Sequence, residues 1–232
     1  MTYLEMSSAF SGSKVQLSES MLEAFHVYAA LLKEWNEKIN LTAITEEPLV
    51  VEKHFYDSLL IAKNMDFAGK TIADIGSGAG FPGMALAIAF PESKVTLIDS
   101  TRKKFLFLDE VKKTLKLKNV NFHVGRVEEM KREKNHFDIV TARGFAAMNI
   151  FLEVASPLAK IGGTLIAMKS LKGEEELVKS KFALRRLCLE KTSTQKDVLP
   201  DGEIRLNYYF VKKENTPSSY PRPWGEILKK PL

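Results

Sequence analysis

The sequence predicts an α/β fold built on a mostly parallel sheet, with a helical extension before it. From Thr71 to Met168, short β-branched runs alternate with longer helical stretches, which is typical of a parallel sheet covered by helices on both faces. Before residue 69 the apolar residues recur at helical spacing instead. The 232 residues are 45% hydrophobic and 27% charged, which suits one compact unit and excludes a largely disordered chain.

The extension is expected to span residues 1–68 and to contain two helices. Ser20, with Glu23 three positions later, has the pattern of a capping box. Pro48 suits the first residue of a second helix that runs toward Met65. The first helix is amphipathic, and its apolar face is formed by Leu22, Phe25, Ala29, Leu32, Trp35 and Ile39.

The alternating region is expected to span residues 69–213. The predicted strands are 71–75, 95–99, 120–124, 137–142 and 164–168. The first predicted helix follows the glycine loop and ends at 90, and the other predicted helices are 102–117, a helix near 127, 148–159 and 174–187. Residues 205–212 indicate a late strand that pairs antiparallel at the edge of the sheet. The tail, 214–232, is basic, contains proline and is predicted to be irregular.

The strongest functional signal is the loop DIGSGAGFPG, from Asp74 to Gly83, between the first predicted strand and the next helix. Glycines permit positive φ and let a ligand approach the main chain, at the edge where such sheets bind ligands. Asp99 ends the next strand, 23 residues after Gly76, where a carboxylate can accept hydrogen bonds from ribose hydroxyls. The loop and the acid together predict a nucleoside cofactor.

Two cofactor classes fit this loop. Its glycines match the dinucleotide pattern, but Phe81-Pro82 occupies the helix start, where a pyrophosphate would need free N–H groups. Asp74 would repel a pyrophosphate and attract the cationic ammonium and sulfonium of S-adenosylmethionine. Capping of backbone N–H groups is the alternative role for Asp74. We expect S-adenosylmethionine as the cofactor, contacted by Asp74, Gly76, Gly78, Gly80, Phe81 and Asp99.

Charge, cysteine and histidine content bear on the partners, the metal content and the location of the protein. The net charge is +5, and the stretch from Arg102 to Lys118 carries seven basic residues against two acids, which fits either a polyanion footprint or a solvated helix face. The single cysteine, Cys188, is expected in the core, and the histidines show no two-ligand spacing, so no metal is expected. Without a membrane-length apolar run or a signal-peptide pattern, a cytoplasmic location is expected.

Further motifs lie outside the glycine loop and extend over nearly the whole chain. They are WNEKINLT (35–42), HFYDS (54–58), LIDS (97–100), GRVEE (125–129), FDIVTAR (137–143), AMK (167–169), YPR (220–222) and KKPL (229–232). On these residues the chain resembles the bacterial 16S ribosomal RNA guanine-N7 methyltransferase family RsmG, also called glucose-inhibited division protein B. The resemblance implies a Rossmann-like class I S-adenosylmethionine-dependent methyltransferase fold.

The resemblance also implies roles for particular residues. Cofactor contacts fall on Gly76, Phe81, Val127, Glu128 and Arg143, with Asp99 at the ribose. Arg143 is also the candidate catalytic residue, orienting the substrate or the cofactor. The implied partner is 16S rRNA or the small ribosomal subunit, and we expect the protein to act as a monomer. Guanine N7 carries a lone pair, so direct in-line transfer needs no general base.

Basic residues at a helix start and in the tail are the candidate RNA contacts. The tail departs from the family because PWGEIL, 223–228, stands where the family has a Pro-Gly-Thr-Pro type run. Two other functions stay open. One is a nicotinamide-dependent oxidoreductase, supported by Gly78, Gly80, Gly83 and Asp99 and by Tyr208 with Lys212, and the other is a nucleic-acid-binding protein without activity. The candidate RNA contacts are Arg102, Lys103, Lys104, Arg222, Lys229 and Lys230.

Overall fold

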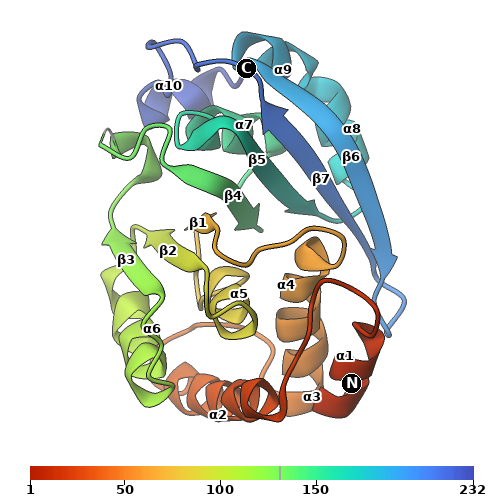
Figure 1. The fold of residues 1–232 in the computed structure, drawn as a ribbon. Helices are drawn as coiled ribbons and strands as arrows, with labels where there is room; N and C mark the ends of the chain where they lie inside the picture. The colour runs from red at the N-terminus through yellow and green to blue at the C-terminus, as the bar shows by residue number, and fades with distance from the viewer. Residues whose placement is uncertain (131) are drawn as a thin grey trace.

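A seven-stranded sheet in the order β3-β2-β1-β4-β5-β7-β6 forms the centre of the molecule (Figure 1). The computed structural model describes residues 1–130 and 132–232. The first five strands are parallel, and β7 pairs antiparallel with both β5 and β6. The strands are β1 (Thr71–Ile75), β2 (Lys94–Asp99), β3 (Val120–Val124), β4 (Phe137–Arg143), β5 (Ala159–Lys169), β6 (Leu189–Val198) and β7 (Ile204–Lys212).

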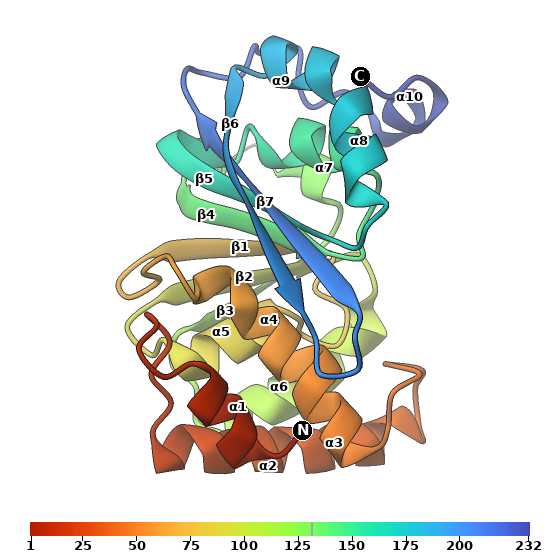
Figure 2. The same ribbon diagram turned by 90° about the vertical axis from the view of Figure 1, so that its right-hand side faces the viewer.

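Helices cover both faces of the sheet (Figure 2). One face carries α1 (Tyr3–Ala9), α2 (Glu19–Asn36), α5 (Gly83–Ala89), α6 (Arg102–Thr114) and the helical segment before β1. The other face carries the short 3-10 helix η3 (Val127–Glu129), α7 (Met148–Ala155), α8 (Gly173–Lys179), α9 (Lys181–Arg186) and α10 (Trp224–Lys229). No helix of the described residues is both long and apolar enough to cross a membrane.

The order of the strands places a switch point between β1 and β4. The chain runs outward from β1 through β2 to β3, then returns to β4 on the other side of β1. The loops that follow β1 and β4 therefore lead to opposite faces, and the space between them is where parallel sheets bind ligands. The glycine loop and Arg143 both lie at this place in the chain.

The helical extension differs in detail from its prediction. Ser18 caps α2, because its Oγ accepts the N–H of Met21 at 3.3 Å, so the expected cap at Ser20 is wrong. Pro48 does lie in the first turn of a second helical segment. That segment is not one regular helix but α3 (Glu47–Val50), the π-helix η1 (Val51–Tyr56), α4 (Asp57–Leu59) and the 3-10 turn η2 (Leu60–Ala62).

The antiparallel part of the sheet contains a strand that the sequence did not predict. β7 pairs with β5 as expected, but β6 occupies the edge, so the edge position expected for residues 205–212 is wrong. The residues of β6 are mostly exposed and polar, which leaves no alternating apolar pattern to detect. The β6–β7 hairpin reaches down beside α4 (Figure 2), where the Gln195 amide donates to the Leu60 carbonyl at 2.8 Å.

Two further expectations fail near the end of the chain. Cys188 is not in the core: it lies half-exposed in the turn before β6, with a positive φ of 56°. The tail is not irregular throughout, because Trp224–Lys229 forms α10 and buries Ile227 completely in the core on the α7 side of the sheet. The boundaries at 68/69 and 213/214 stay predictions.

Candidate active site

The glycine loop between β1 and α5 is shaped mainly by contacts within the protein. Gly80 has φ +96°, and a Cβ added there would lie 2.5 Å from the Tyr28 hydroxyl. That hydroxyl is fully buried and donates a hydrogen bond to the Ala79 carbonyl. The space above Gly80 is therefore filled by helix α2 of the extension, and not left open for a ligand.

Asp74 lies beneath this loop. Its Oδ2 accepts the N–H of Gly83 at 2.8 Å, at the start of α5, and its Oδ1 has no hydrogen-bond partner among the described residues. Burial raises the pKa of Asp74 to about 7, against the opposing effects of the Gly83 N–H and the positive charge of Arg143. The structure thus shows the capping role for Asp74, and a direct cofactor contact stays a prediction.

A first cavity of about 260 Å³ opens at the ends of β1 and β2. Four of the predicted cofactor residues line it: Gly76, Asp99, Val127 and Glu128. The side chain of Phe81 is directed elsewhere, because its ring is buried between Tyr28 and His54, with centroids 5.4 and 4.5 Å away. The full lining is Ile75, Gly76, Ile98, Asp99, Ser100, Lys104, Gly125, Arg126, Val127, Glu128, Gly144, Phe145 and Trp224.

Asp99 is held as a charged group at this cavity. Its Oδ1 accepts the N–H of Thr101 at 2.8 Å, and its Oδ2 accepts the N–H of Gly78 at 3.1 Å. Burial would raise the pKa of Asp99, but these hydrogen bonds and the Lys104 ammonium together lower it. Lys104 Nζ lies 3.2 Å from Oδ2, so this lysine faces the first cavity instead of the surface expected for an RNA contact.

Two aromatic residues, Phe145 and Trp224, form one wall of the first cavity, and the sequence did not predict them as cofactor contacts. Phe145 follows β4, and a Cβ added to Gly76 would lie 2.6 Å from its Cδ2. Trp224, from α10, has its ring centroid 6.0 Å from that of Phe145. The detectable signal was the spacing of Trp224 and Ile227 after Pro223, which is that of one face of a short helix.

Arg222, one of the candidate RNA contacts, forms an ion pair within the protein. Its guanidinium makes a two-pronged contact with the buried carboxylate of Glu153, with Nε to Oε1 at 2.8 Å and Nη2 to Oε2 at 2.6 Å. This geometry fixes the tail on α7 and uses the guanidinium internally. Arg102, Lys103, Lys229 and Lys230 are exposed.

A second cavity of about 640 Å³ adjoins the first, and Gly144 and Phe145 line both. Its side chains carry an excess of positive charge. Five are cationic, Lys53, Arg143, Lys169, Lys172 and Arg205, and three are carboxylates, Asp57, Glu176 and Glu203. The remaining lining residues are Ile44, His54, Gly144, Phe145, Ala146, Met168 and Ser170.

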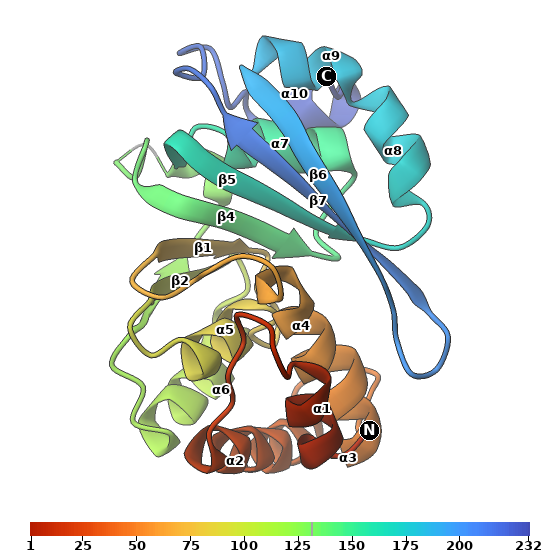
Figure 3. The ribbon, with the colours of Figure 1, turned by 45° about the vertical axis from the view of Figure 1, so that its right-hand side comes forward.

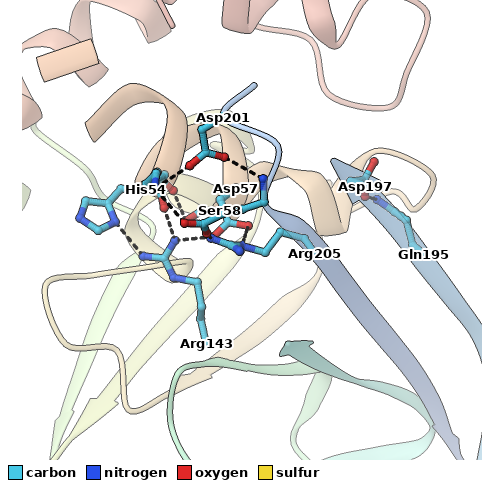
Figure 4. Close-up of polar contacts among 10 residues, drawn as sticks. His54, Asp57, Ser58, Arg143, Gln195, Asp197, Asp201 and Arg205 are labelled. Atoms are coloured by element: carbon cyan, nitrogen blue, oxygen red, sulfur yellow. Dashed lines mark hydrogen bonds and ion pairs between the residues drawn. The ribbon is translucent and has the colours of Figure 1, made fainter. Parts of the chain in front are cut away.

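Arg143 is fixed in the wall of this second cavity by the extension (Figure 4). Its Nη1 donates to the Lys53 carbonyl at 2.8 Å and to Asp57 Oδ2 at 3.0 Å. Its Nη2 lies 3.1 Å from Nδ1 of His54. Since a guanidinium carries five N–H groups, the Nε–H and one Nη2–H have no hydrogen-bond partner among the described residues.

The contact with Arg143 defines the protonation of His54. Arg143 only donates, so His54 Nδ1 must accept and the ring proton must be on Nε2, which lies 2.8 Å from Thr42 Oγ1. Burial, with the positive charge of Arg143, lowers the pKa of His54 to about 3. His54 is therefore a neutral hydrogen-bond acceptor for Arg143. It belongs to the π-helix η1, and π-helical turns are frequent at functional sites.

Tyr208 and Lys212, the residue pair of the oxidoreductase alternative, do not line either cavity. Lys212 is buried in the sheet, where its Nζ donates to Asn135 Oδ1 and to the carbonyls of Ser156 and Ala159 at 2.7 to 2.9 Å. Tyr208 is buried on the same strand.

The neutral state of His54 predicts a pH-dependent stability. The unfolded chain protonates His54 near pH 6.5, whereas the folded protein resists protonation until about pH 3. Stability from this site is therefore complete above pH 6.5 and is lost as the pH falls. Relative to His54→Asn, the wild type should lose about 2 kcal/mol of unfolding free energy between pH 7.5 and pH 5. Urea unfolding at both pH values measures this difference, and parallel losses in the two proteins would contradict it.

Comparisons with known proteins identify a family. The model of the GidB family, described as rRNA small subunit methyltransferase G, matches residues 21–202. The chain is 44% identical over 222 residues to the Ribosomal RNA small subunit methyltransferase G of Exiguobacterium sp. strain AT1b, covering 94% of this chain and 93% of that protein. It is 43% identical over 230 residues to the protein of that name from Exiguobacterium sibiricum, covering 97% of each.

A solved structure confirms the class I methyltransferase fold expected from the sequence. A single-residue mutant of the 16S rRNA (adenine(1408)-N(1))-methyltransferase from Catenulisporales acidiphilia matches with a TM-score of 0.55 at 15% identity. The match covers 68% of this chain and 89% of that chain. The family match spans most of the residues that build both cavities. The chain therefore belongs to the GidB family of rRNA small subunit methyltransferase G proteins.

Proposed function

We propose that this protein transfers a methyl group from S-adenosylmethionine to N7 of a guanine in 16S rRNA. The observation that carries the proposal is the pair of adjoining cavities, which share Gly144 and Phe145 at the ends of the parallel strands. The first offers a charged carboxylate at the ribose position, and the second offers excess positive charge to a polyanion. Membership of the family, and the names of its relatives, support rRNA as the substrate.

The residues of the first cavity fit S-adenosylmethionine. Asp99 is ionised, and each of its oxygens has lone-pair capacity for a ribose hydroxyl when Lys104 moves aside. Val127 and Glu128 would border the adenine, and Gly76 offers its backbone beneath Phe145. When bound, S-adenosylmethionine supplies an electrophilic methyl group. Asp74 caps α5 from beneath the loop, and its direct contact with the cofactor stays a prediction.

The second cavity would hold the target nucleotide. Arg143 keeps two N–H groups for a base edge or a phosphate, at a position fixed by three contacts to the extension. No proton has to be removed from guanine N7, so this reaction needs no general base, and the groups around Arg143 are not arranged to act as one. Both ring nitrogens of His54 and both carboxylate oxygens of Asp57 are already engaged. Catalysis would then depend on positioning.

We also propose how the RNA approaches. Arg102 and Lys103, at the exposed start of α6, would contact phosphates beside the first cavity, and Lys229 and Lys230 would do so from the end of α10. Lys53, Lys169 and Lys172 contribute from the second cavity. The small ribosomal subunit is the proposed partner, and a monomeric state and a cytoplasmic location stay predictions.

The proposed function is tested by measuring methyl transfer to isolated small ribosomal subunits. The subunits are taken from cells that lack the enzyme, so that the target position is unmethylated. The purified protein is incubated with these subunits and tritium-labelled S-adenosylmethionine, and the RNA is digested to nucleosides for chromatography. We expect the label in N7-methylguanosine. Label in another nucleoside would contradict the proposed target, and binding of NAD in place of S-adenosylmethionine by calorimetry would favour the oxidoreductase.

Trp224 provides an independent test of the cofactor cavity. The chain has two tryptophans, and Trp35 lies on α2, away from this cavity. S-adenosylmethionine should quench the fluorescence of Trp224, because its ring forms part of the cavity wall beside Phe145. The quenching should persist in Trp35→Phe and disappear in Trp224→Phe. Equal quenching in Trp224→Phe would place the cofactor elsewhere.

A further inference from the structure

Recognition of a guanine requires hydrogen-bond acceptors as well as cations in the second cavity. The Watson–Crick edge of guanine presents two adjacent donors, N1–H and the 2-amino group. Lysine and arginine only donate, so the five cationic side chains of this cavity cannot pair with these two donors. Three carboxylates line the cavity among the described residues: Asp57, Glu176 and Glu203. A carboxylate is the strongest acceptor that the lining offers, ahead of the Ser170 hydroxyl and the backbone carbonyls.

Two of these carboxylates are already occupied by cations. Asp57 lies between two arginines, with Oδ2 3.0 Å from Arg143 Nη1 and Oδ1 3.1 Å from Arg205 Nε (Figure 4). Glu203 also uses both oxygens, with Oε1 2.9 Å from Lys53 Nζ and Oε2 2.8 Å from Arg205 Nη2. Turning either carboxylate toward a base would break an ion pair at the cavity wall.

Glu176 differs because one of its oxygens makes all of its contacts. Oε2 accepts the N–H of Met148 at 2.7 Å and lies 2.8 Å from Lys169 Nζ. Oε1 accepts no hydrogen bond from the residues that the structure describes. The side chain is 27% exposed, so Oε1 is accessible in a cavity that Glu176 lines.

The occupied oxygen also fixes the position of the free one. Met148 N–H is the first of α7, and the residue before it, Ala147, has no side chain that can cap this helix. Glu176 supplies the cap from α8, the helix next to α7 (Figure 3). Lys169 donates to Glu176 and to the Ala146 carbonyl, next to Phe145. Glu176 is thus tied to the segment that separates the two cavities.

We propose that Oε1 of Glu176 accepts hydrogen bonds from N1–H and the 2-amino group of the target guanine. The proposal rests on the proposed function, since it assumes a guanine in the second cavity. Glu176 would determine base specificity, because adenine places an acceptor at N1 and has no 2-amino group to donate. Lys169 and the Met148 N–H would hold the carboxylate while the base enters.

Inosine separates this role from a structural one, because inosine is guanosine without the 2-amino group. The substrate is a small subunit rebuilt with 16S rRNA that carries either guanosine or inosine at the position found by the methylation assay. The variant is Glu176→Gln, which keeps one oxygen for Met148 and Lys169. Glu175→Gln, an exposed neighbour on the same helix, is the matched control. Calorimetry with S-adenosylmethionine reports whether the cofactor cavity is intact.

We expect the wild type and Glu175→Gln to lose about 10-fold in kcat/KM when guanosine is replaced by inosine, as for one lost base contact. Glu176→Gln should lose about 10- to 100-fold on guanosine, show little further loss on inosine, and keep the wild-type Kd for the cofactor.

Two results would overturn the assignment. One is a Glu176→Gln enzyme with the same guanosine-to-inosine ratio as the wild type. The other is a wild type that methylates both substrates equally, which is decisive even if the variant does not fold. A wild type that methylates neither substrate, but binds the cofactor, would instead remove the proposed function on which the assignment rests.

Discussion

The structure around both cavities depends on how one partly buried cation is held. Arg143 ends β4, yet its guanidinium makes its hydrogen bonds with residues of the extension, 86 to 90 positions earlier in the chain. A partly buried ion pair is costly unless its hydrogen bonds are satisfied. Here a carbonyl, a carboxylate and a neutral imidazole satisfy three N–H groups, and two N–H groups are left for a ligand.

This arrangement explains why the extension is part of the site and not an appendage. The π-helical turn η1 contributes the Lys53 carbonyl and the His54 ring, and Asp57 follows at once in α4. His54 stacks on Phe81, and Phe81 stacks on Tyr28, whose hydroxyl binds the glycine loop. The extension, the glycine loop and the end of β4 are thereby connected through side chains that pack on one another.

Much of the fold could be predicted because it is encoded locally. The parallel strands, the glycine loop and Asp99 follow from short patterns, and Gly76, Asp99, Val127 and Glu128 do line one cavity. The features that were missed depend on contacts between distant segments. Strand β6 has an exposed polar sequence, and Trp224 lines the cavity in a tail that is held by contacts such as Arg222 with Glu153. Similarly, no local pattern shows that Lys104 would turn toward Asp99.

Arg143→Lys separates binding of the cofactor in the first cavity from placement of the RNA in the second. The residue lines the second cavity and not the first, so we expect an unchanged Kd for S-adenosylmethionine by calorimetry. Methyl transfer to small subunits should fall about 100-fold, because a lysine cannot reproduce the planar contacts of the guanidinium. A large rise in the cofactor Kd with unaltered methyl transfer at saturating cofactor would contradict the account.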